Sequence, residues 1–148
     1  MEPQTDFKDL LALFNEHKVK YLIVGAYALA FHGVPRFTGD MDILVKPCSE
    51  NAKKILRALN AFGFGSLGLA AADFEKSGQV IQLGVPPVRV DLITSLTGVS
   101  WEEAFSGKMP DHYGSVPVYY IGRKQFVVNK RKTRRKKDLA DLEALGER

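Results

Sequence analysis

The order of apolar and polar residues along the chain predicts short helices alternating with short strands. Four apolar residues near the N-terminus recur at the spacing of one helix face: Phe7, Leu10, Leu11 and Phe14. Thr5 precedes them as a candidate N-cap. The apolar run over residues 21–24 predicts a buried strand, and residues 27–32 predict a second helix that ends near Gly33 and Pro35.

The middle of the chain predicts three strands and a longer helix. Residues 40–45 alternate with the period of a strand, so Asp40 and Asp42 lie on one face and Met41 and Ile43 on the other. Ser49 is a candidate cap for a helix with four apolar residues on one side: Ile55, Leu56, Leu59 and Phe62. Residues 79–83 and 88–93 predict two strands joined by a short connection of hairpin type at residues 84–87.

The remaining pattern completes a small mixed fold. A short helix is predicted around residues 101–105, a strand over residues 116–120, and a basic helical region over residues 122–148. The chain has 148 residues and neither repeats nor linkers, which predicts a single domain over residues 1–148. Elements in this order predict an α/β or α+β fold, in which helices pack on a small mixed β-sheet.

Composition narrows the class of protein. Apolar residues make up 45% of the chain and charged residues 26%, as in globular proteins. No apolar run approaches the roughly 20 residues that cross a bilayer, so no membrane contact is expected. The N-terminus lacks the basic and apolar regions of a secretory signal, which favours a cytoplasmic location. The single Cys48 cannot form an intramolecular disulfide and is expected to be a half-buried small side chain.

Three aspartates carry the candidate chemistry. Asp40 and Asp42 project to the same side of one predicted strand, so their carboxylates can share a divalent ion. Asp91, on a separate predicted strand, can complete an oxygen-rich site of the kind that Mg²⁺ prefers. Gly25 and Ala26 follow a strand and open a helix, where small residues let a triphosphate approach the backbone. A tight turn and an exposed acidic strand end are the structural alternatives for these two motifs.

In this order, the motifs resemble those of the nucleotidyltransferases related to DNA polymerase beta. Small members of that superfamily carry Gly-Gly or Gly-Ser, then Asp-x-Asp or Asp-x-Glu, then a third Asp. Residues 24–42 are most similar to AbiEii-type and related bacterial proteins, which include toxins of toxin–antitoxin systems. The Lys-Asp-Leu-Ala-Asp-Leu pattern of residues 137–142 also fits. Ala26 departs from the superfamily pattern, because it has no hydroxyl to contact phosphate.

The resemblance implies a role for each candidate residue. Asp40, Asp42 and Asp91 would hold two Mg²⁺ or Mn²⁺ ions, and Asp91 would help to deprotonate the acceptor. Lys130 would reach the triphosphate of an NTP, although a solvated surface lysine is an open alternative. Arg36 and Thr38 precede the metal-binding strand, where they could touch phosphate or belong to a surface loop. His32 is expected to be structural.

Two other functions stay open at this stage. The chain could bind a nucleotide without catalysis, which Ala26 alone favours. It could also bind nucleic acid through residues 129–137, of which seven of nine are Lys or Arg. The active enzyme would transfer a nucleoside monophosphate to RNA, protein or a small molecule, with an antitoxin or another protein as partner. Asp138 and Asp141 would either orient Lys130 and Arg134 toward the site or form ordinary surface pairs, and Leu139, Leu142 and Leu145 would form the packing stripe of that helix.

Overall fold

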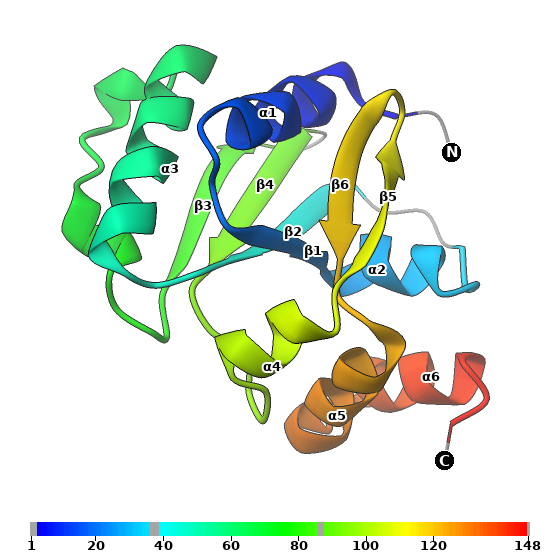
Figure 1. The fold of residues 1–148 in the computed structure, drawn as a ribbon. Coiled ribbons are helices and arrows are strands. Elements are labelled where there is room, and N and C mark those ends of the chain that lie inside the picture. The colour runs from blue at the N-terminus through cyan, green and yellow to red at the C-terminus, as the bar shows by residue number, and fades with distance from the viewer. Residues whose placement is uncertain (1–2, 36–38, 86–87, 148) are drawn as a thin grey trace.

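The computed structural model describes residues 3–35, 39–85 and 88–147 (Figure 1). The α-helices of this part are α1 (Thr5–Glu16), α2 (Gly25–Phe31), α3 (Ser49–Phe62), α4 (Trp101–Ser106), α5 (Arg123–Thr133) and α6 (Lys136–Ala144). The strands are β1 (Tyr21–Val24), β2 (Asp40–Val45), β3 (Val80–Val85), β4 (Val88–Ile93), β5 (Met109–Tyr113) and β6 (Val116–Tyr120). Two short 3-10 helices, Gly65–Leu67 and Ala71–Phe74, connect α3 to β3.

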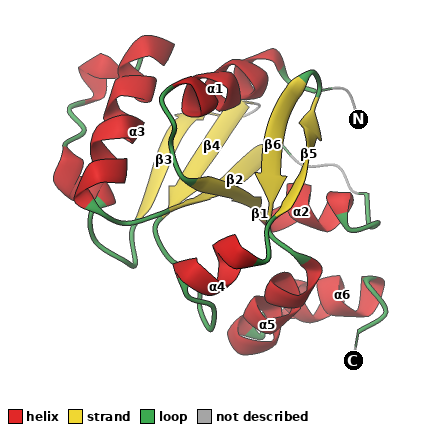
Figure 2. Cartoon of the chain, in the orientation of Figure 1, coloured by secondary structure: helices red, strands yellow, loops and turns green. Residues whose placement is uncertain are grey.

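The strands form one six-stranded sheet in the order β3-β4-β2-β1-β6-β5 (Figure 2). β2 runs parallel to β4 and β1 runs parallel to β6, whereas the other neighbours are antiparallel. The mixed sheet and its helices confirm the predicted α/β class. The parallel pairing of β2 with β4 is the feature that positions the candidate site, because it sets Asp42 directly opposite Asp91.

Helices α1 and α3 lie side by side against one face of the sheet (Figure 1). Phe7 and Leu10 of α1 share a cavity wall with Val90 of β4. Because side chains alternate along a strand, Asp91 must project to the opposite face. The apolar stripe predicted for α1 is buried as expected, with Leu11 and Phe14 each 0% exposed.

The predicted helix caps are wrong by one residue. Thr5 and Ser49 are the first helical residues, and Gln4 and Cys48 hold the extended N-cap position without a side-chain hydrogen bond. Each hydroxyl therefore comes one position too late to accept a bond from the first helical turn. The predicted end of α3 is correct, because Gly63 holds the left-handed C-cap conformation at φ 107°.

Strand β5 was not predicted, and the bounds of β3 differ from those expected. Four of the five residues of β5 are exposed, because it is an edge strand that pairs only with β6. Its side chains therefore show no apolar alternation, although Gly114-Ser115 is a two-residue hairpin signal. β3 runs from Val80 to Val85 rather than over residues 79–83, so Gly84 belongs to the strand.

Candidate active site

The register of two parallel strands brings the predicted carboxylates to one face of the sheet. Asp42 of β2 lies opposite Asp91 of β4, and Asp40 lies opposite Arg89. Since residues two apart on a strand share a face, these four side chains form a two-by-two group. The predicted convergence of acidic residues from two strands therefore occurs, but with an arginine as its fourth member.

This group lines a cleft of about 410 Å³. The backbone at Gly25 and Ala26 forms one wall, where β1 leads into α2. Further side chains come from the C-terminal half of the chain: Ile121, Phe126, Asn129, Lys130, Arg135, Lys137 and Asp141. The sheet contributes the acidic groups and the C-terminal segment contributes basic ones, so the cleft combines a potential metal site with a potential anion site.

Gly25 packs against the carboxylate of Asp42. Its backbone is left-handed at φ 66°, a conformation that strains any residue with a side chain. A Cβ atom at this position would overlap Oδ2 of Asp42 and lie 3.0 Å from its Cγ. Glycine is therefore required here for two independent reasons, and one of them is the position of a candidate catalytic carboxylate.

Asp42 is held in an environment that disfavours its charge. Burial, followed by repulsion from Asp91, raises the pKa of Asp42 from 3.8 to about 6, against the opposing effect of Lys137. A half-buried carboxylate among like charges destabilises the fold unless a cation compensates. The protein thus retains a residue that costs stability, as functional sites often do.

Arg89 supplies part of that compensation, and its role was not foreseen. Its Nε and Nη2 atoms donate hydrogen bonds of 3.0 and 2.9 Å to the two carboxylate oxygens of Asp91. Nη1 lies 3.8 Å from Oδ2 of Asp40. Because Arg89 stands two residues before Asp91 on one strand, the alternation of side chains could have indicated this pair.

Lys130 is a buried lysine rather than a solvated one. Its side chain is 8% exposed, and Nζ lies 3.1 Å from Oδ1 of Asp138 and 3.6 Å from Oδ2 of Asp141. Asp138 also accepts hydrogen bonds from Thr133 and from the backbone and side chain of Arg135. Burial alone would raise the pKa of Asp138, but these hydrogen bonds outweigh it and hold that pKa well below its ordinary value.

The network thus matches the interpretation that Asp138 and Asp141 orient Lys130, and the alternative of ordinary surface pairs is wrong. The second basic partner is Arg135 instead of Arg134, which adopts a left-handed conformation at the end of α5. Leu139 is 47% exposed and does not belong to the packing stripe of α6, whereas Leu142 and Leu145 do. The expected stripe placed Leu139 on the buried face, which Asp138 and Asp141 occupy instead.

The Asp138→Asn change is expected to lower the free energy of unfolding by about 3–5 kcal/mol, because it removes one of the two negative charges that pair with the buried Lys130. Urea denaturation followed by circular dichroism measures the change. Glu147→Gln is the matched control, since Glu147 makes more exposed ion pairs with Arg123 and Arg131, and its effect should stay below about 1 kcal/mol. Equal stability of Asp138→Asn and the control would contradict a structural role for this network.

Four further predicted residues have the following positions. Arg36 and Thr38 lie outside the described residues. His32 forms a 2.8 Å hydrogen bond between Nε2 and the carbonyl oxygen of Ile121, in agreement with its predicted structural role. Cys48 is half-buried, as expected.

The donor set of the cleft suits a hard divalent cation, since carboxylate oxygens are the ligands that Mg²⁺ and Mn²⁺ prefer. Burial and then repulsion from Asp91 raise the pKa of Asp42, and a bound cation would relieve this repulsion. However, no three acidic, histidine or cysteine side chains of the described residues are already arranged to hold a metal ion. The carboxylate oxygens are therefore suitable ligands for a divalent ion, whereas the positive charge of Arg89 beside them disfavours its binding.

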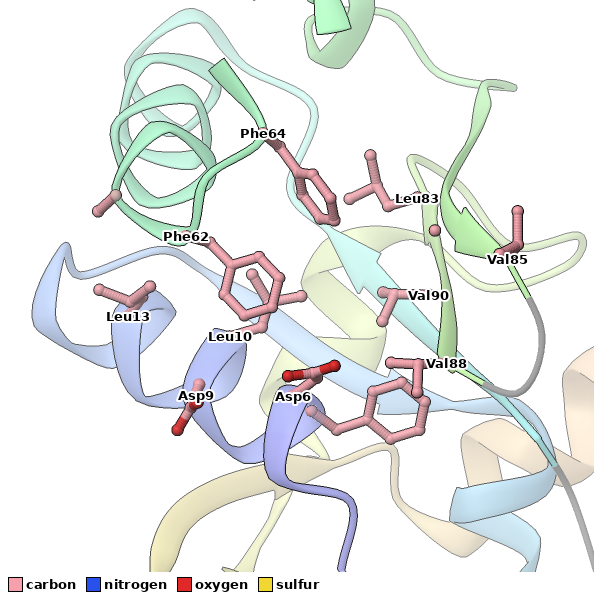
Figure 3. A pocket seen from close by; sticks show the side chains of 13 residues that line it. Asp6, Asp9, Leu10, Leu13, Phe62, Phe64, Leu83, Val85, Val88 and Val90 are labelled. Carbon is pink, nitrogen blue, oxygen red and sulfur yellow. The ribbon is translucent and has the colours of Figure 1, made fainter. Parts of the chain in front are cut away.

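A larger cavity of about 650 Å³ lies on the other face, between α1, the end of α3 and β3–β4 (Figure 3). Figure 3 shows Phe62 and Phe64 pointing toward Leu83 and Val90 of the sheet. The acidic residues at this cavity, Asp6 and Asp9, both come from α1. It brings together none of the predicted site residues, so the smaller polar cleft is the candidate active site.

Solved structures with the same architecture are nucleotidyltransferases or resemble them. A candidate nucleotidyltransferase from Thermotoga maritima is similar at a TM-score of 0.61 and 15% identity, over 96% of this chain and 91% of that chain. ANT(2'')-Ia in complex with adenylyl-2''-tobramycin gives 0.56 and 14%, over 94% and 84%. The chain has the nucleotidyltransferase fold. An antigenic nucleotidyltransferase-like protein from Paracoccidioides brasiliensis also shares it, at 0.56 and 14% over 97% and 77%.

Sequence comparisons add nothing to this likeness, since no family model and no curated protein match the chain. Similarity at 14 and 15% identity shows the nucleotidyltransferase fold and identifies no substrate. Among the described residues, no helix combines the length and the apolar character that crossing a membrane requires.

Proposed function

We propose that this protein is a metal-dependent nucleotidyltransferase that moves a nucleoside monophosphate from an NTP to an acceptor and releases pyrophosphate. The acceptor is RNA, a protein or a small molecule. Two Mg²⁺ or Mn²⁺ ions serve as cofactors. The observation that carries the proposal is the group formed by Asp40, Asp42 and Asp91 on one face of β2 and β4, beside the Gly25 backbone.

The acidic side of the cleft would hold the ions. Asp40 and Asp42 would share them, and Asp91 would hold the second ion and help to take the proton from the acceptor hydroxyl. Bound divalent ions would offset the negative charge that develops on the attacking and leaving oxygens of an in-line displacement. Because Gly25 has no side chain, its backbone lies directly against the carboxylate of Asp42, so a phosphate bound at this backbone would lie close to the carboxylates.

The basic side of the cleft would bind the triphosphate. Lys130 and Lys137 both line the cleft, as does Arg135, whose guanidinium donates to Asp138. Lys130 is fixed by its ion pairs with Asp138 and Asp141, so its position costs little entropy on binding. Ala26 offers only its backbone, which suffices for a phosphate that approaches a small residue.

The alternative of a nucleic-acid-binding module receives less support. Part of the basic run is already paired within the fold, because Lys130 is buried against Asp138 and Asp141 and Arg131 pairs with Glu147. A silent nucleotide-binding protein remains the alternative that Ala26 favours. We further propose, from the similarity of residues 24–42 to AbiEii-type proteins, that an antitoxin is its protein partner.

The proposal predicts metal-dependent transfer of label from an α-³²P-NTP to one acceptor class. Purified protein is incubated with each of the four labelled NTPs, Mg²⁺ or Mn²⁺ and a whole-cell extract. RNA, protein and small-molecule fractions are then separated and counted. We expect label in one fraction, and none with EDTA or with the Asp42→Ala variant. Bound nucleotide without any transfer would favour the silent protein, and salt-sensitive nucleic-acid binding without metal or NTP would favour the binding module.

A further inference from the structure

Arg89 occupies a position in the candidate site that competes with a metal ion. Its guanidinium contacts both oxygens of Asp91 at 2.9 and 3.0 Å, the two-pronged geometry of a strong arginine–carboxylate pair. The same guanidinium lies 3.8 Å from Oδ2 of Asp40, across the paired strands. One fixed positive charge therefore sits between two of the three carboxylates proposed to bind metal.

The charges of this group account for the presence of an arginine there. Three carboxylates on one sheet face repel one another, and the guanidinium reduces this repulsion without any bound ion. The hydrogen bonds to Asp91 in turn raise the pKa of Arg89, so it stays charged. A divalent cation bound by Asp40 and Asp91 would meet this positive charge at close range, and the two cations would repel each other.

The side chain is free enough to leave this position. It is 28% exposed, and its contact with Asp40 is too long for a hydrogen bond. Both side-chain hydrogen bonds of Arg89 therefore go to Asp91, on the same strand. Movement of the side chain would break these two hydrogen bonds and the longer ion pair with Asp40, and would leave the backbone pairing of β2 with β4 intact.

We propose that Arg89 is a built-in counter-cation that holds Asp91 in the metal-free protein and is displaced when a divalent ion binds. This inference rests on the proposed function, because it concerns the same carboxylates. Arg89 thus lowers the metal affinity of the site and stabilises the fold in the absence of metal. Removal of Arg89 should therefore increase metal affinity and decrease stability without metal. A purely structural residue would show only the loss of stability.

Mn²⁺ binding, measured by isothermal titration calorimetry with the metal alone, tests this role. Arg89→Gln should bind Mn²⁺ about tenfold more tightly than the wild type, because a neutral amide no longer repels the ion. Without metal, the same variant should melt at a lower temperature than the wild type, and Mn²⁺ should raise its melting temperature by more. Arg89→Lys keeps the charge but not the two-pronged contact, so its affinity should lie between the other two.

Arg57→Gln is the matched control, because Arg57 is exposed on α3 and does not line the cleft. It should leave both Mn²⁺ affinity and melting temperature unchanged. Wild-type binding of Mn²⁺ with equal or weaker binding by Arg89→Gln would overturn the inference and leave the proposed function standing. If neither protein binds Mn²⁺ and the wild type transfers no nucleotide, the proposed function fails together with the inference.

Discussion

The Asp42→Asn variant is expected to lose nucleotidyl transfer and yet to be more stable than the wild type at neutral pH when metal is absent. The loss of activity should reach about a thousandfold, the upper range for removal of one charge-stabilising group. Label transfer from an α-³²P-NTP measures this loss. The amide has nearly the shape of the carboxylate, so the close contact with Gly25 remains.

The gain in stability follows from the raised pKa of Asp42. Burial and the neighbouring Asp91 raise this pKa from 3.8 to about 6, so the folded protein binds a proton more readily than the unfolded chain between these values. The free energy of unfolding of the wild type therefore falls as pH rises through this window. Asparagine has no charge to lose or gain, so the variant escapes this decrease.

The advantage of Asp42→Asn should thus be absent below about pH 4 and complete above about pH 7, where it should be on the order of 1–2 kcal/mol for a partly exposed group. Thermal melts at several pH values without divalent ions measure it. Asp9→Asn, an exposed change on α1, should alter neither activity nor stability. Mg²⁺ should stabilise the wild type but not Asp42→Asn. Wild-type turnover in this variant would show that the assigned metal site is wrong.

The Gly25→Ala variant is expected to lose both activity and stability. Its left-handed backbone conformation costs about 1–2 kcal/mol for any residue with a Cβ atom. The added methyl group would also overlap the carboxylate of Asp42 and force it to move. Since a displacement of about 1 Å in a catalytic group can cost about a hundredfold in rate, transfer should fall by at least that factor.

The Gly63→Ala variant is the control that separates backbone strain from overlap with the Asp42 carboxylate. Gly63 also has a positive φ, but a Cβ atom there would have no neighbour within 4 Å. Its position at the end of α3 lies outside the cleft. This control should lose the stability that the backbone strain costs, about 1–2 kcal/mol, and keep its activity. If Gly25→Ala retains wild-type transfer, the contact between Gly25 and Asp42 has no part in the reaction.

Much of the fold and part of the site could be predicted from local sequence patterns. The spacing of apolar residues predicted α1, α3 and the strands around Asp40 and Asp91, because each pattern reflects the periodicity of one element. The same periodicity indicated that Asp40 and Asp42 share a face. Local patterns did not reveal β5, since an edge strand buries only one of its five residues.

The contacts of Lys130 and Arg89 could not all be predicted from local patterns alone. A basic run of residues predicts a charged helix, but Lys130 is buried because Asp138, eight residues further along, meets it across the turn from α5 to α6. Arg89 could have been placed on the face of Asp91 from strand alternation. Its contact near Asp40, however, exists only because β2 and β4 are neighbours.

Most of the helices and strands, and the side chains that share a face in α1, α3 and β2, followed from sequence alone, because those properties depend on the repeat of a single helix or strand. The tertiary structure alone decided that Asp42 stands opposite Asp91, that Gly25 touches Asp42, and that the basic C-terminal segment faces these acids. Such contacts join residues far apart in the chain. They depend on strand order and pairing register, which no periodicity within one element specifies.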